Sequence, residues 1–318
     1  MSSDLWSITC YFNPCRYRTK RENFDIFMDG MKKNGANVLV VELAFGDEEF
    51  ELPASDNVLQ LRGGGVMWQK ERLLSIAAAQ LPPECRKIAW LDNDLLFDDP
   101  RWAERTSEAL DRFMVVQPFS SCIRLVRGTQ SYDGGGETYE SFSHCFVRVP
   151  AQARGSDFAY HGHTGFAWAA RRELFEEVGL YDPCLTGSGD HLMAHGFAGG
   201  MRRSPCMKRV IGEQPRYLRH YLRWADKARA LVKGRVGYIP GTLLHLWHGD
   251  LADRRYTDMN NQFMTFDFDP DRHLELDEQK LLVWSDKAPE RLREWADKFF
   301  WLRREDGDPA DEPIAVNA

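Results

Sequence analysis

The order of apolar patterns in the N-terminal third of the chain is the strongest constraint on its fold. Residues 5–12 alternate in the manner of a strand and end at the turn Asn13-Pro14, and residues 38–43 and 87–91 have the pattern of buried strands. Between them, residues 19–33 and 67–80 carry apolar side chains at helical spacing, as at Phe24, Phe27, Met28 and Met31. Strands that alternate with helices in this way predict a doubly wound α/β fold with a mostly parallel sheet.

The remaining patterns extend a single domain. Residues 115–118 predict a fourth strand, and residues 120–162 have little periodicity, which favours a long loop facing the substrate. Regular patterns return at 166–178 and 238–247, and residues 289–303 predict a C-terminal helix. We expect one domain over residues 1–270, with a donor-binding half to about residue 118 and an acceptor-binding, catalytic half from about 119. Residues 271–318 are expected to form a helical extension and a loose tail.

Composition excludes several classes of protein. The 318 residues are 43% hydrophobic and 28% charged, which is typical of a well-packed globular protein. No apolar run approaches about 18 residues, and the N-terminus lacks a basic segment followed by an apolar one, so neither a membrane span nor a signal peptide is predicted. The seven cysteines are scattered without a CxxC pair, which favours reduced thiols in the cytoplasm over a zinc ribbon. The net charge of −7 argues against a nucleic-acid coat.

Two carboxylates follow the third predicted strand. Asp92 and Asp94 come directly after the apolar run 87–91. In open α/β sheets, ligands bind beyond the carboxyl ends of the strands, and residues two apart on an extended segment point the same way. Oxygen ligands of this kind suit Mg²⁺ or Mn²⁺ shared with substrate phosphates. The alternative is a polar turn that merely ends a strand.

A third acid lies in a glycine-rich turn. Residues 164–178 have the pattern of a small-residue strand followed by an amphipathic helix, and Gly187-Ser188-Gly189-Asp190 follows. Glycines let the backbone approach a ligand closely, and Asp190 stands where the next helix is expected to begin. Asp190 is therefore either a functional acid or a helix cap.

Two histidines close the last predicted strand. His245 and His248 follow the apolar run that begins at Tyr238, and Arg254, Arg255 and Tyr256 come shortly after. Histidine is a common metal ligand, although isolated histidines are more often structural. The arginines suit phosphate geometry, or they form the solvated start of a helix.

A basic segment interrupts the acidic average. Residues 202–235 hold eleven Lys or Arg and two acids, and Arg216, Arg219, Arg223 and Lys227 share one helical face. This face is either solvated or it binds an anionic acceptor, which could be a lipid phosphate, a phosphorylated glycan or nucleic acid.

The carboxylate motifs resemble those of GT-A glycosyltransferases. Trp90-Leu91-Asp92-Asn93-Asp94 is similar to their Asp-x-Asp motif, and the run from Gly165 to Asp190 is similar to that of beta-galactosyltransferase-like, inverting families. The resemblance implies that Asp94 binds the metal, that Asp92 joins it and contacts the donor, and that Asp190 is the catalytic base. It also implies that His248, with His245 as the alternate, completes a Mn²⁺ or Mg²⁺ site. Ser188 and Gly189 depart from the pattern, because those families have Gly and Glu there.

The resemblance extends to substrate contacts. Residues expected to bind the donor are Phe12, Arg16, Arg18, Glu42, Lys70, Asp92, Asn93, Arg255 and Tyr256. Residues expected to bind the acceptor are Gly165, Trp168, His191, Arg216, Arg219 and Arg223.

Together these features predict a metal-dependent, inverting glycosyltransferase with a nucleotide-sugar donor, a UDP-sugar by resemblance. The acceptor is expected to be a glycan, a lipid-linked sugar or another anionic molecule, and nucleic acid stays open. Three alternatives remain at this point: a retaining transferase or a nucleotidyltransferase on the same fold, or a non-catalytic nucleotide- or glycan-binding module.

Overall fold

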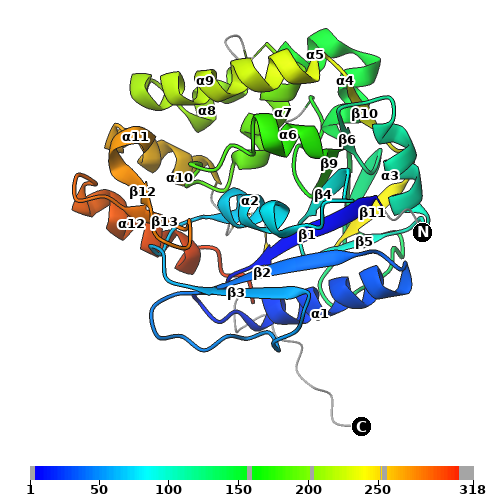
Figure 1. Ribbon diagram of the computed structural model, residues 1–318, viewed down its shortest axis with the longest axis horizontal. Coiled ribbons are helices and arrows are strands. Elements are labelled where there is room, and N and C mark those ends of the chain that lie inside the picture. Colours follow the sequence, from blue (N-terminus) through cyan, green and yellow to red (C-terminus); the bar gives the residue numbers. More distant parts are fainter. Residues whose placement is uncertain (1–3, 156–159, 201–203, 251, 253–255, 308–318) are drawn as a thin grey trace.

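A computed structural model describes residues 4–155, 160–200, 204–250, 252 and 256–307. Its centre is a seven-stranded sheet with the strand order β10-β6-β9-β4-β1-β2-β3 (Figure 1). The strands of this sheet are β1 (Leu5–Tyr11), β2 (Val38–Ala44), β3 (Val58–Arg62), β4 (Lys87–Leu91), β6 (Val115–Gln117), β9 (Ala167–Arg171) and β10 (Val236–Tyr238). All neighbouring pairs are parallel except those of β9, which runs antiparallel to β4 and β6.

Helices cover both faces of this sheet, because its strands are apolar on both sides. The helices α1 (Arg18–Lys33) and α3 (Trp102–Leu110) pack on one face. On the other face lie α2 (Lys70–Gln80), α6 (Arg172–Glu177), α7 (Gly189–Ala198) and α9 (Pro215–Val232). Figure 1 shows α1 and α2 on opposite sides of β1 and β2. The structure confirms the predicted fold class, a doubly wound, mostly parallel α/β sheet flanked by helices.

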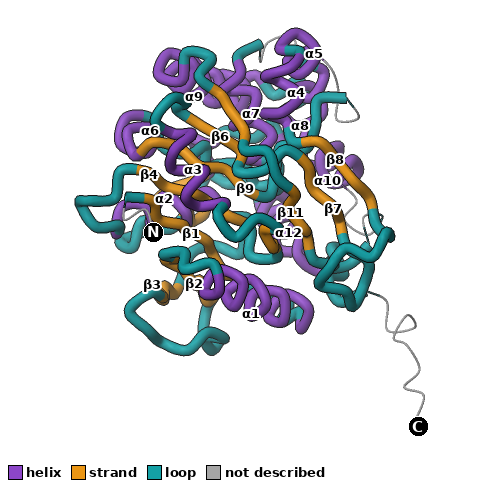
Figure 2. The backbone as a smooth tube through the Cα atoms, turned by 90° about the vertical axis from the view of Figure 1, so that its right-hand side faces the viewer, coloured by secondary structure: helices purple, strands orange, loops and turns teal. Residues whose placement is uncertain are grey.

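A second, smaller sheet stands beside the first with the order β5-β11-β7-β8. Its strands are β5 (Leu95–Phe97), β11 (Thr242–His245), β7 (Ser121–Arg124) and β8 (Glu137–Glu140), and Figure 2 shows the last three side by side. Strands β7 and β8, with α4 (Phe142–Arg148) and α5 (Pro150–Gly155), occupy the segment expected to be one long loop. These elements are too short to show a hydrophobic period, so the sequence pattern missed them.

The C-terminal part wraps back over the α2 side of the sheet. It consists of α10 (Tyr256–Phe263), a 3-10 turn (Met264–Phe266), α11 (Pro270–His273), β12 (Leu274–Leu276), β13 (Leu282–Trp284) and α12 (Glu290–Trp301). The short helix α8 (Pro205–Val210), which precedes α9 in the chain, contacts α10. Leu292, Trp295 and Phe299 of α12 belong to the same buried cluster as Leu73 of α2. The predicted C-terminal helix is therefore part of the main core.

The residues after α12 return to the start of α1. Tyr17, the residue before α1, makes no side-chain cap. Instead, the backbone N–H groups of Arg18 and Thr19 donate to the carboxylate of Asp306 at 3.1 and 2.8 Å. An acceptor at a helix N-terminus satisfies donors that have no partner within the helix. Asp306 thus caps α1 from the other end of the chain.

Two general properties complete the fold. No helix in the described ranges is both long and apolar enough to cross a membrane. The six cysteines whose side chains are described are free. The predicted boundary near residue 270 stays a prediction.

Removal of this distant cap tests how the C-terminal segment is held. We expect Asp306→Ala to lower the free energy of unfolding by about 1 kcal/mol, the usual cost of losing a helix cap. Urea unfolding followed by circular dichroism measures this change. Asp47→Ala, a truncation of an exposed aspartate, is the matched control. Equal stability of the two variants would contradict the capping role of Asp306.

Candidate functional site

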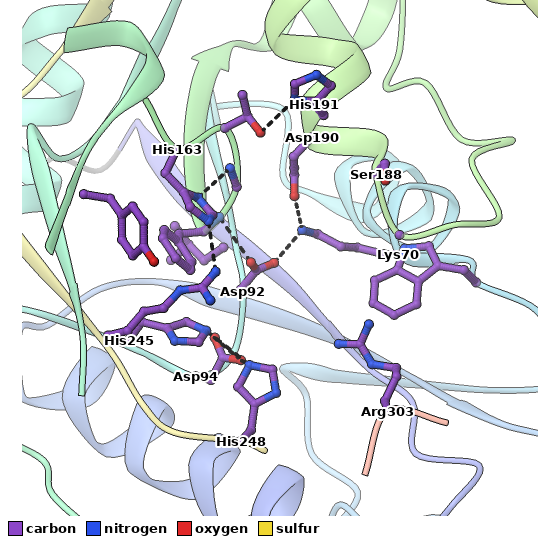
Figure 3. Close-up of a pocket in the computed structure, with 18 of the residues that line it drawn as sticks. Lys70, Asp92, Asp94, His163, Ser188, Asp190, His191, His245, His248 and Arg303 are labelled. Atoms are coloured by element: carbon purple, nitrogen blue, oxygen red, sulfur yellow. Dashed lines mark hydrogen bonds and ion pairs between the residues drawn. The ribbon is translucent and has the colours of Figure 1, made fainter. Parts of the chain in front are cut away.

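The described residues enclose a cavity of about 1030 Å³ beyond the carboxyl ends of β1 and β4. Phe12 follows β1, Asp92 follows β4, and Gly165 and Phe166 precede the antiparallel strand β9. Figure 3 shows the polar side chains that point into this space. This is the edge of the sheet at which the sequence placed the carboxylates, because parallel strands end there together.

A buried lysine joins two of the predicted acids. Lys70, the first residue of α2, places its Nζ 2.5 Å from Oδ1 of Asp92 and 2.7 Å from Oδ2 of Asp190 (Figure 3). Burial alone would lower the pKa of Lys70, but the two carboxylates outweigh it and hold that pKa well above its usual value. Lys70 therefore stays protonated and ties the end of β4 to the start of α7.

The backbone fixes Asp92 from the other side. The N–H of Phe166 donates to Oδ2 of Asp92 at 3.2 Å, and the N–H of Asp92 donates to the carbonyl of Phe166 at 2.8 Å. Phe166 has a φ of +79°, which is uncommon for a bulky residue. Its ring stacks on His163 with centroids 3.8 Å apart. Strained backbone of this kind clusters at functional sites.

Asp190 lies in the first turn of α7, and its side chain is largely buried. Burial raises the pKa of Asp190, while Lys70 opposes that rise. No side-chain cap is present at Ser188, the residue before the helix. Asp190 points to Lys70 and into the cavity, so the helix-cap interpretation is not what the structure shows.

Asp94 meets both candidate histidines. Its Oδ2 lies 3.1 Å from Nε2 of His248 and 3.7 Å from Nε2 of His245, and the two Nε2 atoms are 3.2 Å apart. The three ligand atoms lie within 4.8 Å of one another. The sequence treated the histidines as alternatives, but strand β11 and the turn after it bring both to Asp94.

This group suits a divalent cation. Oδ1 of Asp94 is buried and has no hydrogen-bond partner in the described part of the chain, as expected of an atom that a cation would satisfy. One carboxylate and two imidazoles form a mixed set, and the imidazoles favour Mn²⁺ over Mg²⁺, which prefers oxygen ligands alone. Asp92, predicted as a further ligand, instead contacts Lys70.

The C-terminal segment adds two residues that the sequence did not single out. Oε1 of Glu305 lies 3.9 Å from Nδ1 of His248, the ring nitrogen away from Asp94, and 2.6 Å from Nε of Arg303. Burial would raise the pKa of Glu305, but Lys20 and Arg303 outweigh it and hold that pKa well below its usual value. A carboxylate behind a histidine orients the ring toward a metal. Nothing in the local sequence marks Glu305, because its partner lies far back along the chain.

Several further side chains of the cavity wall also escaped the sequence patterns. The cationic ones, apart from Lys70, are Lys20, Arg124, Arg209 and Arg303. They come from separate elements; Arg209 belongs to the basic segment 202–235, and the other three lie in no motif that the sequence analysis identified. Positive charge of this kind, around a space that could hold a cation, suits an anionic ligand.

A second buried carboxylate lies against the glycine-rich turn. A Cβ on Gly189 would collide with the carboxylate of Glu71, so a larger residue there would require the Glu71 side chain to move. Both carboxylate oxygens of Glu71 are buried, and no residue that the structure describes hydrogen-bonds them; burial raises the pKa of Glu71 to about 8. The acid that the resembled families carry at position 189 is absent, and the Glu71 side chain occupies the adjacent space.

Some predicted contacts lie at the cavity and others do not. Phe12, Lys70, Asn93, Gly165 and His191 line it. Trp168 does not: it is buried and stacks on Trp90 at 6.3 Å.

Three predicted donor residues are engaged elsewhere in the described structure. Arg16 pairs with Glu48 and Glu51, and Arg18 lies 3.7 Å from Glu22. Oε1 of Glu42 accepts the N–H groups of residues 51 and 52, at 2.6 and 3.1 Å. None of the three is among the cavity-lining residues, so donor contacts through them stay predictions.

The basic face of α9 also lies away from the described cavity wall. Arg216 pairs with Asp267 at 2.6 Å, and Arg223 pairs with Asp271 at 2.6 Å. Arg219 is likewise not among the lining residues. These ion pairs agree with a solvated face, and acceptor binding by it stays a prediction. Arg255 and the side chain of Tyr256 lie outside the described residues.

Comparisons with known proteins find no matching family model and no matching curated protein. Similar solved structures include a mutant Drosophila beta-1,4-galactosyltransferase 7 with manganese, UDP-Gal and xylobiose (12% identity, TM-score 0.40, 92% of this chain and 98% of that chain). Another is the 4-diphosphocytidyl-2C-methyl-D-erythritol synthase of Anaerococcus prevotii (10%, 0.35, 93% and 96%). A third is a glycosyltransferase involved in glycosylating the major capsid of PBCV-1 (10%, 0.31, 76% and 92%). At these low TM-scores, function rests on the site geometry alone.

The state of Glu71 has a measurable effect on stability. Because its pKa in the folded protein, about 8, exceeds that of an unfolded Glu, Glu71 favours folding at low pH. This contribution is lost as pH rises through about 4.5 to 8. We expect Glu71→Gln to gain stability relative to the native protein over that range, by at most about 1.4 kcal/mol per pH unit. Urea unfolding at pH 5, 6.5 and 8 measures the difference. A difference that stays constant with pH would show that Glu71 is ionised throughout.

Proposed function

We propose that this protein is a metal-dependent glycosyltransferase that moves a sugar from a nucleotide-sugar donor to an acceptor hydroxyl. One observation carries the proposal: a single cavity holds the Asp94–His245–His248 group and the Lys70–Asp190 pair. This transfer needs two parts: a bound cation that stabilises the leaving diphosphate, and a carboxylate that accepts the proton of the acceptor hydroxyl.

The donor diphosphate is assigned to the end of the cavity that holds Asp94. A cation bound there would neutralise the negative charge that the leaving nucleoside diphosphate gains. Arg303 and Lys20 line the same cavity and can add charge-assisted hydrogen bonds to phosphate oxygens. Trp68 and Phe12, packed edge to face at 5.4 Å, offer apolar surface for the nucleoside. A uridine nucleoside remains part of the proposal by resemblance.

Asp190 is assigned as the general base. Lys70 holds its Oδ2, and no described residue hydrogen-bonds its Oδ1, which leaves that atom for the acceptor hydroxyl. As the proton moves to Asp190, the acceptor oxygen forms a bond to the anomeric carbon. The bond from that carbon to the diphosphate breaks, and the leaving group takes the electron pair. Burial raises the pKa of Asp190, which makes it a stronger base than an exposed aspartate.

The alternatives differ in their products. A retaining transferase would give the opposite anomer, which product NMR distinguishes. A nucleotidyltransferase would release pyrophosphate in place of a nucleoside diphosphate. A non-catalytic module would bind nucleotide without turnover, and it would have no need to keep Lys70, Asp92 and Asp190 buried together, because burying charged groups is costly.

The metal assignment predicts that chelation abolishes transfer and that Mn²⁺ restores it. Asp94→Ala should lose Mn²⁺-dependent binding of a nucleoside diphosphate, measured by calorimetry, because the ligand facing both histidines is gone. His245→Ala and His248→Ala should each weaken binding less, since phosphate oxygens and water also coordinate. Asp98→Ala, four residues along and exposed, serves as the control. Native-like, Mn²⁺-dependent affinity in Asp94→Ala would refute this assignment.

The base assignment predicts a separation of binding from turnover. Asp190→Asn keeps the side-chain shape and loses the proton acceptor, so donor affinity should persist while transfer falls by roughly 10²-fold or more. Steady-state rates and donor titrations on the same preparation measure both. Asp226→Asn on the exposed side of α9 should leave both unchanged. Near-native turnover of Asp190→Asn would leave Asp190 a structural partner of Lys70.

A further inference from the structure

A second group of potential ligands lies deeper in the protein, behind Asp190. His191 and His195 are four residues apart on α7, and His161 comes from the segment that leads to β9. All three are buried, and their ring centroids are 4.7 to 5.2 Å apart. Histidines four apart share one helical face, so a third from a facing segment completes a three-sided set.

The ring nitrogens are close enough to share an ion after small side-chain rotations. One nitrogen from each ring lies within 4.8 Å of those of the other two. Tetrahedral zinc with bonds of about 2.0–2.1 Å holds its nitrogen ligands about 3.4 Å apart. Histidine rings on a helix and a loop can close this difference by turning about their side-chain torsions.

In two of the three rings, Nδ1 has a polar contact with a neighbouring residue. Nδ1 of His161 lies 2.6 Å from the carbonyl oxygen of Gly162, which only accepts, so in neutral His161 the proton is on Nδ1 and Nε2 has the lone pair. Nδ1 of His191 lies 3.4 Å from Oγ1 of Thr164. Metal-bound histidines commonly use the second nitrogen in this way.

His195 gives the independent sign of a missing ligand. Its side chain is fully buried, and neither ring nitrogen has a hydrogen-bond partner among the described residues. A buried polar group without a partner is costly and uncommon in native proteins. Burial also lowers the pKa of His195 to about 3 and that of His191 well below its usual value. Both are therefore neutral, which is the form that binds metal.

We propose that His161, His191 and His195 form a zinc site that ties the segment before β9 to helix α7. Three imidazoles without a carboxylate suit Zn²⁺ better than they suit Mn²⁺ or Mg²⁺, the cations assigned to the Asp94 group. His191 also lines the cavity, so water can reach the fourth position. Because α7 carries Asp190 and the tied segment leads to Gly165, the ion would hold two walls of the cavity in register.

This site is separate from the group around Asp94. Figure 3 shows His191 and His248 at opposite ends of the cavity, with Lys70 and Asp92 between them. Zinc binding by the three histidines does not rest on the proposed transfer reaction, and either can fail without the other.

The test uses a background in which the first group is removed. The double variant Asp94→Ala/His248→Ala, freed of metal by chelation, should bind about one equivalent of Zn²⁺ in competition with a chromophoric chelator. Co²⁺ in its place should give the visible absorption of a tetrahedral complex. The melting temperature should rise with Zn²⁺ concentration, because an ion that binds only the folded state stabilises it.

Further substitutions in the same background locate the ion. Thr164→Val removes the hydrogen-bond partner of a proposed ligand, His191, and should weaken Zn²⁺ binding by about 10- to 100-fold. His195→Gln removes a proposed ligand itself and should weaken binding by more than that. His273→Gln, at a buried histidine outside both groups, should bind as the background does. Arg209 lines the same cavity, and its positive charge acts on His191. Because that charge would repel a bound cation, Arg209→Gln should bind Zn²⁺ at least as tightly as the background does.

Two results would overturn the proposal. One is a folded background variant that takes up no Zn²⁺ and shows no rise in melting temperature, which would make the histidines a packing cluster against Phe142. The other is undiminished binding in His195→Gln and Thr164→Val, which would place the ion elsewhere. Thr164→Val preserves side-chain volume, so the test holds even if His195→Gln fails to fold.

Discussion

The contact on which the site depends is the buried lysine between two carboxylates. Lys70 reaches Asp92 at the end of β4 and Asp190 at the start of α7, and all three side chains are largely removed from water. A charge in such a place is tolerated only when it is paired. Loss of Lys70 would leave two acids facing each other with no positive charge between them. The pairing therefore fixes how the sheet edge, α2 and α7 meet, and with them the shape of the cavity.

Around this contact the chain divides its ligands by chemistry. The carboxylate of Asp94 and two imidazoles stand at one end, with Glu305 behind His248. The group His161, His191 and His195 stands beyond the other end. A mixed oxygen and nitrogen set and an all-imidazole set differ in the ions that they prefer. The first lies where a diphosphate could share its ion, and an ion at the second would join helix α7 to the segment before β9.

The site residues that could be predicted from the sequence are those that lie directly after strands. Asp92 and Asp94 come straight after an apolar run, and in a parallel sheet that position is an exposed edge. His245 ends β11, which pairs with β5 just after Asp94, so local pattern and sheet topology agree. Phe24, Phe27 and Met31 were predicted from their spacing to form the apolar face of a helix, and they are buried on α1.

The parts that escaped prediction depend on contacts between distant segments. Glu305 and Asp306 act on His248 and α1 only because α12 turns the chain back, and no local pattern encodes that return. Glu71 sits against Gly189 across two helices. Arg216 was predicted from its helical face as a possible acceptor contact, but it forms an ion pair with Asp267, which lies 51 residues later in the chain. The spacing of residues in the sequence predicts which side chains share a face of a helix or strand. Ion pairs between distant segments then decide which charged side chains can still bind a ligand.

The central claim is that this cavity breaks the bond between a sugar and a diphosphate. Its most direct test is ³¹P NMR of the protein incubated with Mn²⁺ and each of a panel of nucleotide sugars, followed with and without added chelator. The account predicts that at least one donor yields its nucleoside diphosphate, that no pyrophosphate appears, and that chelation stops the reaction. Release of pyrophosphate, or donor cleavage that continues unchanged in excess chelator, would contradict it.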